Sequence, residues 1–157
     1  NRKRSAFVDL YRGDVNDQLV PYVRPQENGC KTDVRWAALT CDSGEGLMAI
    51  CRSIDRDGLE ITAMPYLSAD FDAREGFDYG PVHLEQKHIK DVAPRPFVRW
   101  NIDYGQRGVG GVDSWYSKPL DHYQLKPGRE YEYSFSLVPV KGSSAEELIS
   151  AFKATAH

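Results

Sequence analysis

The sequence predicts a mainly β fold of antiparallel sheets, with a short internal helix and a helix at the C-terminus. Three observations support this prediction. Short runs in which apolar and polar residues alternate recur along the 157-residue chain, and this period of two is typical of half-buried strands. Turn signals rich in Gly and Asp separate several of these runs. Helical spacing of apolar residues is clearest near the C-terminus.

The clearest strand prediction is a hairpin. The run Asp33–Thr40 and the run Leu47–Cys51 flank the turn sequence Asp42-Ser43-Gly44-Glu45-Gly46, which supplies the residues that tight turns require. In the last run, 131–138, alternation places Tyr131 and Leu137 on one face. The same kind of pattern predicts strands over residues 7–11, 59–64, 97–104 and 131–138.

Two segments predict helices. Pro81 suits a first helical turn, so residues 82–87 are expected to form a short helix. The second helix is expected within residues 143–156. Ser143 or Ser144 can cap it, because Glu146 or Glu147 follows three residues later as the capping-box partner. Its apolar face combines Leu148, Ile149 and Phe152.

Composition bounds the class of protein. The net charge is −3, and the only basic run, Arg2-Lys3-Arg4, is too short to indicate a nucleic-acid partner. No apolar stretch approaches the roughly 20 residues of a membrane span. The chain opens without Met, so we expect it to be cut from a longer protein whose compartment stays open. Spacing typical of zinc sites is absent around Cys30, Cys41 and Cys51, which are expected to be free thiols in or near the core.

Three segments occur in an order that is specific to one family. They are Pro21-Tyr22-Val23-Arg24-Pro25-Gln26-Glu27-Asn28-Gly29, Thr32-Asp33-Val34-Arg35-Trp36, and the run from Asn101 to Trp115 that ends Gly110-Gly111-Val112-Asp113-Ser114-Trp115. Together they resemble the C-terminal (small-chain, fifth) domain of the β-galactosidases of glycoside hydrolase family 2. The resemblance covers about residues 6–139, and residues 1–157 would be the C-terminal part of that domain.

The resemblance implies a five-domain bacterial enzyme, cytoplasmic or periplasmic, that hydrolyses terminal β-D-galactosides through a covalent intermediate. Its catalytic carboxylates would lie on a central (β/α)8 barrel, the partner of this domain, and homo-oligomers are possible. The last domain would be an antiparallel β-sandwich that resembles the galactose mutarotase fold. Family members often use Mg and Na ions in other domains. We therefore expect no cofactor, no metal and no catalytic residue in this chain, which alone should be inactive.

One residue is the candidate for substrate binding. The resemblance implies that Trp115 reaches the mouth of the barrel's active site, whereas without the resemblance a buried core position would be the better interpretation of this Trp. Gly108, Gly110 and Gly111 before it allow unusual backbone angles and close approach of the chain. In the run from Gly110 to Trp115, many family members have a second Asp at the position of Val112. Residues expected to form structural or interdomain loops are Gln26, Glu27, Asn28, Gly29, Gly110, Gly111, Asp113 and Ser114.

Alternative functions stay open at this point. An independent carbohydrate-binding module would present several exposed aromatic rings on one face, such as Trp115, Tyr116 and Tyr123. A mutarotase-like enzyme, suggested only by fold analogy, would bring a His and a carboxylate into one cleft. Asp70 and Asp72 could be taken for a catalytic or calcium-binding pair, but a solvated loop is the better interpretation.

Overall fold

The computed structural model describes residues 8–20, 28–53, 58–71, 91–108, 110, 113, 116–142 and 144–155. The chain divides into two compact units. Unit 1 comprises residues 1–31 and 62–101, and unit 2 comprises residues 32–61 and 102–157. Each unit is considered by itself below.

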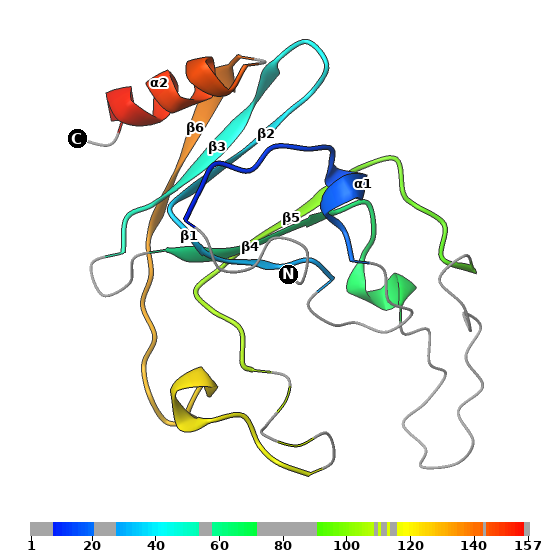
Figure 1. The fold of residues 1–157 in the computed structure, drawn as a ribbon, viewed down its shortest axis with the longest axis vertical. Helices are drawn as coiled ribbons and strands as arrows, with labels where there is room; N and C mark the ends of the chain where they lie inside the picture. The colour runs from blue at the N-terminus through cyan, green and yellow to red at the C-terminus, as the bar shows by residue number, and fades with distance from the viewer. Residues whose placement is uncertain are drawn as a thin grey trace. The chain divides into compact units, whose positions relative to one another are not determined.

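Six strands and two α-helices form the described parts of the fold (Figure 1). They are α1 (Val15–Gln18), β1 (Lys31–Val34), β2 (Trp36–Thr40), β3 (Glu45–Cys51), β4 (Leu59–Met64), β5 (Arg99–Asp103), β6 (Phe135–Lys141) and α2 (Ala145–Thr155), with 3-10 turns η1 (Ser68–Asp70) and η3 (Asp121–Tyr123). The strands form two three-stranded sheets, ordered β1-β4-β5 and β2-β3-β6. The predicted β-rich fold with antiparallel pairing and a C-terminal helix is confirmed.

The predicted hairpin is present in unit 2. β2 and β3 pair antiparallel, with Trp36 opposite Ile50 and Thr40 opposite Gly46. The turn is closed by the Cys41 N–H, which donates to the Glu45 carbonyl over 2.9 Å, while Gly44 has a φ of 82° that favours glycine. The predicted single run over residues 33–40 is instead broken at Arg35, which separates β1 from β2.

β6 differs from the prediction in its position. It begins at Phe135 and continues through Pro139 to Lys141, so residues 131–134 precede the strand. Because β6 is the edge strand of its sheet, Pro139 costs no hydrogen bond to a further strand. Leu137 is 52% exposed, whereas Val140 is buried, so the face that contains Leu137 is the outer face of the sheet.

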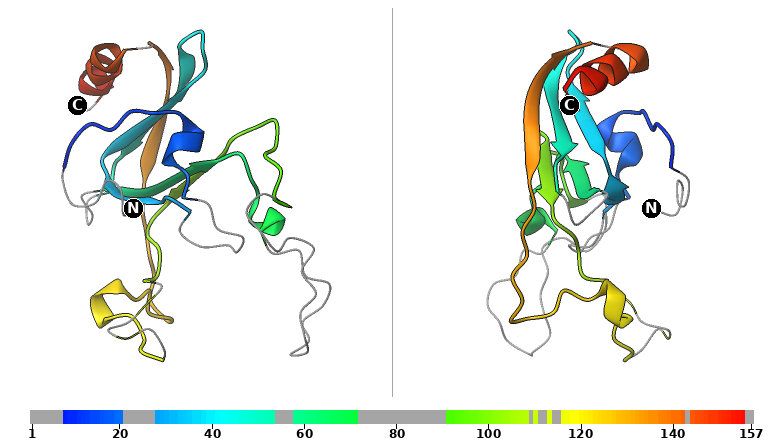
Figure 2. Two further views of the ribbon diagram at one scale, coloured as in Figure 1. Left: turned by 45° about the vertical axis from the view of Figure 1, so that its right-hand side comes forward. Right: turned by 90° about the vertical axis from the view of Figure 1, so that its left-hand side faces the viewer.

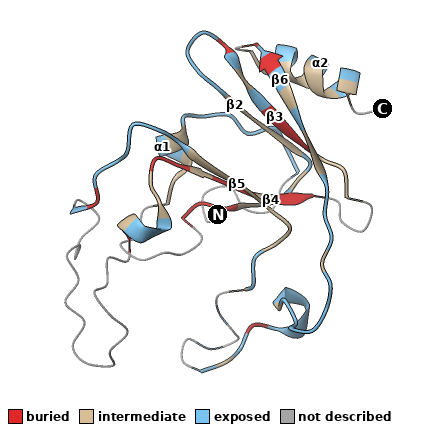
Figure 3. Ribbon diagram, turned by 180° about the vertical axis from the view of Figure 1, so that it is seen from behind, coloured by how far each residue is buried: buried red, intermediate tan, exposed pale blue. Residues whose placement is uncertain are grey.

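Helix α2 covers the inner face of this sheet (Figure 2). Buried Met48, Ile50 and Val140 form the core cluster, and the strand β3 that carries two of them is the most buried part of the sheet (Figure 3). From α2, the apolar side chains of Leu148, Ala151 and Phe152 pack against that cluster. The amphipathic tail predicted from the sequence thus completes the core of unit 2.

Both ends of α2 are held by side chains. The predicted capping box is present: the Glu147 N–H donates to Ser144 Oγ over 3.2 Å, and the Ser144 N–H donates to Glu147 Oε2 over 3.0 Å. At the other end, Arg52 donates from Nη2 to the carbonyl of Thr155 and from Nε to Ser136 Oγ over 3.0 Å. A guanidinium at a helix C-terminus also complements the helix dipole.

Unit 1 has its own small core. Met64, Phe71 and Val92 are buried together, and Leu19 and Tyr66 pack against them. The Tyr66 and Phe71 rings lie 5.2 Å apart between centroids. This cluster joins the end of β4 to the segment before β5.

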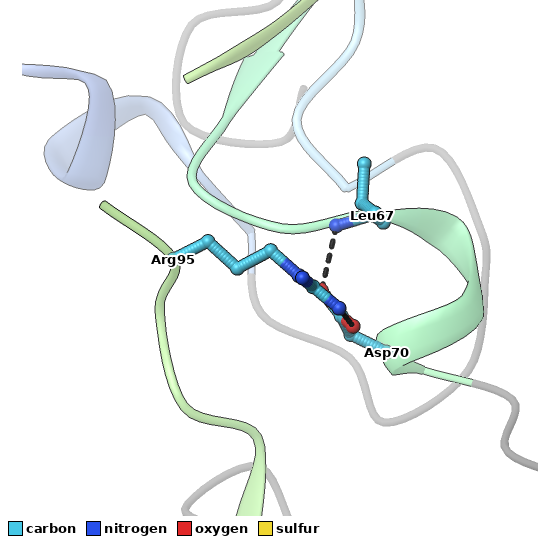
Figure 4. Close-up of polar contacts among 3 residues, drawn as sticks. All are labelled: Leu67, Asp70 and Arg95. Atoms are coloured by element: carbon cyan, nitrogen blue, oxygen red, sulfur yellow. Dashed lines mark hydrogen bonds and ion pairs between the residues drawn. The ribbon is translucent and has the colours of Figure 1, made fainter. Parts of the chain in front are cut away.

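Asp70 fastens the turn that follows β4 (Figure 4). Its carboxylate accepts two hydrogen bonds from Arg95, of 2.8 and 2.6 Å, and one of 2.8 Å from the Leu67 N–H. The Arg95 hydrogen bonds are the main cause of a lowered pKa for Asp70. Asp70 is thus an ion-pair partner and not simply a solvated loop carboxylate, while Asp72 lies outside the described residues.

Two further predictions concern a strand over residues 7–11 and a helix over residues 82–87. The strand predicted over residues 7–11 is wrong for its described part, since residues 8–11 are irregular. Asp9 accepts a hydrogen bond from the neighbouring Leu10 N–H, and Val8 is 81% exposed, so the run has neither a paired strand nor a buried face. The helix predicted over residues 82–87 lies outside the described residues.

Candidate functional site

The first family segment ends in a buried turn. Gln26 and Glu27 lie outside the described residues, but Asn28 and Gly29 have left-handed φ angles of 45° and 87°. The Val20 N–H donates to the Asn28 carbonyl over 3.4 Å, and Asn28 Nδ2 donates back to the Val20 carbonyl over 3.5 Å. Asn tolerates this conformation better than most residues, and Gly adopts it without strain. These contacts bring residues 20 and 28 side by side.

Gly29 also allows a close approach of two backbone segments. A Cβ at this position would lie 2.3 Å from the Gln18 carbonyl oxygen. Lys31 bridges the same place, because its Nζ donates to the Gly29 carbonyl over 2.6 Å and to the Gln18 carbonyl over 3.2 Å. The Asn-Gly pair therefore fixes the path of the chain in unit 1 at the point where the segment rejoins β1.

The third family segment contains the candidate substrate residue. The described residues of this segment include Gly110 and Asp113. They do not include Gly111, Val112, Ser114 or Trp115. Asp113 is exposed, yet its carboxylate accepts hydrogen bonds from two nearby residues. Oδ1 accepts from the N–H groups of Tyr116 and Ser117, both over 3.2 Å, and Oδ2 accepts from Ser117 Oγ over 2.5 Å. These bonds tie the Asp113 side chain to residues 116 and 117.

The two described glycines before Asp113, Gly108 and Gly110, differ in their surroundings. The Gly108 N–H donates to the Tyr123 carbonyl over 2.8 Å, and a Cβ on Gly108 would lie 3.0 Å from the side chains of Pro119 and Tyr123. Gly110 has nothing within 4 Å of such a Cβ. Neither glycine has a left-handed φ, so the expectation of unusual backbone angles is wrong for both. Close approach of the chain is found at Gly108.

An exposed apolar segment follows position 115. Tyr116 is 86% exposed, Leu120 50% and Tyr123 59%. The segment is nevertheless anchored: Pro119 is buried, and Lys126 forms an ion pair of 2.7 Å with Asp121 at the start of η3. The hydrogen bond from Lys126 is also the main cause of a lowered pKa for Asp121. Apolar side chains held in solvent by such anchors form a surface suited to contact with another protein surface or a sugar.

A group of tyrosines that the sequence did not single out supports this region. The Tyr104 ring meets those of Tyr131 and Tyr133, with centroids 5.2 and 6.1 Å apart. The hydroxyl of Tyr133 donates to the Ile102 carbonyl over 3.1 Å, and that of Tyr131 donates to the Lys126 carbonyl over 3.0 Å. Tyr104 belongs to the third family segment, so its position in that motif is the signal that could have identified the group.

The tryptophans on strands and the three cysteines differ in burial. Trp36 and Trp100 are both partly buried, with Trp36 packed against the core of unit 2. All three cysteines are free; Cys30 is buried but Cys41 is exposed, which corrects the expectation of a position in or near the core for Cys41. Within the described ranges, no group of three His, Cys, Asp or Glu side chains is arranged to hold a metal ion. No helix in the described part has the length and apolar character needed to cross a membrane.

Comparison with known proteins identifies the family of this chain. The family described as the β-galactosidase small chain matches residues 1–137. A β-galactosidase of Priestia megaterium is 36% identical over 143 residues, which are 89% of this chain and 12% of that protein. The β-galactosidase BgaC of Bifidobacterium adolescentis is 33% identical over 126 residues, 78% of this chain and 10% of that protein. The chain thus spans about a tenth of the length of these relatives, and it belongs to the β-galactosidase small chain family.

Proposed function

We propose that this chain is a non-catalytic domain of a β-galactosidase, which completes the substrate site and braces the enzyme. The parent would hydrolyse terminal β-D-galactosides with retention of configuration. One observation carries the proposal: residues 1–137 match the small-chain family, while the chain corresponds to only 12% of the length of the Priestia megaterium β-galactosidase. A domain of this size adds to a site whose reacting groups lie elsewhere in the enzyme.

The carboxylates of the chain support a non-catalytic role. A retaining glycosidase needs two carboxyl groups about 5–5.5 Å apart, one as acid and base and one as nucleophile. Asp70 is paired with Arg95 and Asp121 with Lys126, while Asp113 and Glu147 accept hydrogen bonds from local backbone N–H groups. Each of these carboxylates therefore has a structural partner.

Trp115 is the residue proposed to contact the substrate. An indole face packs against the apolar C–H face of a pyranose, and water is released from both surfaces. If the ring is buried against the sugar, this contact is worth about 1–3 kcal/mol. The neighbouring exposed side chains of Tyr116 and Leu120 support a surface that meets the catalytic part of the enzyme beside Trp115.

The test is substitution in the intact enzyme. Trp115→Ala should raise KM for a chromogenic β-galactoside about five- to 150-fold, which corresponds to the loss of about 1–3 kcal/mol. Trp115→Phe should recover part of this loss. The control is Phe97→Ala, which removes a ring outside the three family segments. The Phe97 ring is 45% exposed, and its removal should leave KM unchanged. A Trp115→Ala enzyme with normal KM and a lowered unfolding midpoint would show that the ring is core.

A second assay separates the domain from the whole enzyme. The chain expressed alone should not hydrolyse the chromogenic galactoside, because the paired carboxyl groups would be on the missing part. Turnover that rises in proportion to the concentration of purified chain, in a host strain without β-galactosidase, would contradict the proposal.

An independent carbohydrate-binding module is the second candidate. It is favoured by the exposure of Tyr116 and Tyr123, 86% and 59%, because exposed tyrosines can stack on sugars. Titration of the isolated chain with galactose and lactose distinguishes the two functions. Saturable binding that Tyr116→Ala or Tyr123→Ala abolishes would favour the module.

A further inference from the structure

We infer that strand β2 is the site at which this chain pairs with a second copy of itself, edge to edge and antiparallel. β2 belongs entirely to unit 2, and its pairing is independent of the proposed function. In the sheet order β2-β3-β6, β2 has a neighbouring strand on one side only. An edge strand of this kind presents backbone N–H and C=O groups with which a further strand can pair.

The pairing of β2 with β3 decides which backbone groups of β2 face outward. The Cys41 N–H donates to the Glu45 carbonyl over 2.9 Å. At the other end of the strand, the Arg35 carbonyl accepts from the Cys51 N–H over 2.9 Å. Because successive residues of a strand turn their N–H and C=O groups to opposite sides, every second residue faces away from β3. Among the described residues, no backbone hydrogen bond reaches the outward-facing groups, which belong to Trp36, Ala38 and Thr40.

The two edges of this sheet differ in how well they are protected against a further strand. Natural edge strands often carry Pro or Lys, which oppose pairing. β6 has both, in Pro139 and the exposed Lys141. β2 has the sequence Trp-Ala-Ala-Leu-Thr, which contains neither Pro nor a charged residue. The composition of β2 therefore permits the addition of a strand at its edge, whereas that of β6 disfavours it.

β2 is complementary to an antiparallel copy of itself. When Ala38 lies opposite Ala38 of the second copy, Trp36 of each strand lies opposite Thr40 of the other, so the outward-facing residues oppose one another. Each of these opposed pairs can exchange two hydrogen bonds, and the free groups of both edges are satisfied together. The result is a continuous sheet in the order β6-β3-β2-β2-β3-β6, with a two-fold axis between the two Ala38 residues.

The charges beyond the two ends of β2 fit the same arrangement. Arg35 precedes β2 and Asp42 follows it, and both residues are exposed. Because the paired strands run in opposite directions, Arg35 of one copy comes beside Asp42 of the other at each end of the contact. A parallel arrangement would instead bring like charges together, which is unfavourable. Charge complementarity therefore favours an antiparallel second copy as the occupant of this edge.

The first test is the oligomeric state of the full 157-residue chain in solution. One pair of strands forms a small interface, so the association should be weak. In sedimentation velocity, the average mass should rise from that of a monomer toward that of a dimer between about 10 µM and about 1 mM. A chain that stays monomeric over this range would overturn the inference.

Charge reversal tests which edge is used. Arg35→Glu should weaken the association about three- to tenfold, because like charges then meet at both ends of the contact. Adding Asp42→Arg to this variant should restore the association. Lys141→Glu is the matched control at the end of β6 and should leave the dissociation constant unchanged. These side chains are exposed, so the fold should persist, as circular dichroism can verify. Weakening by Lys141→Glu but not by Arg35→Glu would place the contact at β6 and overturn the inference.

Cysteine pairing tests the register. Ala37 of one copy would lie opposite Leu39 of the other, with Cα atoms about 4.5 Å apart, which is within the range that a disulfide spans. The Ala37→Cys and Leu39→Cys variants are made in a chain that carries Cys41→Ser and Cys51→Ser. Under mild oxidation, a mixture of the two should form disulfide-linked dimers faster than either variant alone. Equal rates in the mixture and in the separate variants would contradict the pairing of β2 in this register.

Discussion

The indole of Trp36 on β2 stacks on the phenyl ring of Phe152 on α2, with ring centroids 5.5 Å apart and an interplanar angle of 20°. This pair joins two elements more than a hundred residues apart in the sequence. It lies beside buried Met48 and Ile50, so the C-terminal helix is part of the folded core of unit 2. The family match ends at residue 137, before the helix begins.

Removal of this ring should therefore destabilise the domain. Phe152→Ala is expected to lower the free energy of unfolding by about 2–3 kcal/mol, less than for a fully buried Phe because the ring is partly exposed. Lys153→Ala, on the exposed side of the same helix, should change it by less than about 0.5 kcal/mol. Urea unfolding followed by near-ultraviolet circular dichroism measures both, and equal stability of the two variants would contradict a core role for α2.

The sequence predicted α2 and the β2-β3 hairpin well because their signals are local. Ser144 and Glu147 form the expected capping box, and Gly44 supplies the turn with its left-handed φ. The prediction begins this strand at Tyr131, four residues before the start of β6 at Phe135. Tyr131 and Tyr133 alternate with polar residues, as apolar residues do in a half-buried strand. In the structure their rings pack on Tyr104, and this distant partner leaves no local signal.

The candidate site was predictable only in part, for the same physical reason. The sequence motif singled out Asp113, but it could not show that its carboxylate binds the backbone of residues 116 and 117. The positions of Leu120 and Tyr123 in solvent depend on the contact between Gly108 and Tyr123 and on buried Pro119. This exposure depends on contacts between residues that are distant in the sequence. The alternation of apolar and polar residues along the chain does not indicate such contacts.

The ion pair of Asp70 with Arg95 should make unit 1 sensitive to acid. Hydrogen bonds from Arg95 hold the folded-state pKa of Asp70 below its ordinary value of 3.8. The ionised carboxylate therefore stabilises the folded chain at pH values above that ordinary value. The contribution is lost as the pH falls through the lower, folded-state pKa.

Two measurements check this expectation. An NMR titration of the Asp70 carboxyl should give a midpoint below pH 3.8, and Arg95→Gln should move it upward. In urea unfolding, the loss of stability caused by Asp70→Asn should be larger at pH 7 than at pH 3. Asp9→Asn serves as the control in the unfolding series, and a loss for Asp70→Asn that is the same at both pH values would contradict the coupling.

Cys41 should be the most reactive of the three thiols. It is exposed in the hairpin turn, and its Sγ lies 3.1 Å from Ser43 Oγ. This hydrogen bond is the main cause of a lowered pKa for the Cys41 thiol, and the thiolate is the form that reacts with alkylating agents. Cys30, at 4% exposure, should be protected.

Brief treatment with iodoacetamide at pH 8, followed by peptide mass spectrometry, measures the order of reaction. We expect Cys41 to be labelled first, Cys51 more slowly and Cys30 last. Ser43→Ala should slow the labelling of Cys41 without changing that of Cys51. Labelling of Cys41 that is no faster than that of Cys30, or that Ser43→Ala leaves unchanged, would refute the expectation.

The first and third family segments offer a matched pair of glycines. Gly29 has a left-handed φ of 87°, and a Cβ there would meet the Gln18 carbonyl oxygen at 2.3 Å. Gly110 has neither constraint, since its φ is ordinary and no atom lies within 4 Å of an added Cβ. The same substitution should therefore destabilise the fold at Gly29 and have little effect at Gly110.

Gly29→Ala should lower the free energy of unfolding by more than about 2 kcal/mol, because it combines the cost of a left-handed Ala with a clash against backbone that cannot easily move. Gly110→Ala should change it by less than about 0.5 kcal/mol. Urea unfolding of the isolated chain measures both. In the intact enzyme, Gly110→Ala gives a further comparison: a raised KM with unchanged stability would mean that the open space around Gly110 is filled by another part of the enzyme or by substrate. Similar stability losses at the two glycines would show that the Asn28-Gly29 turn does not constrain the fold in the way its geometry indicates.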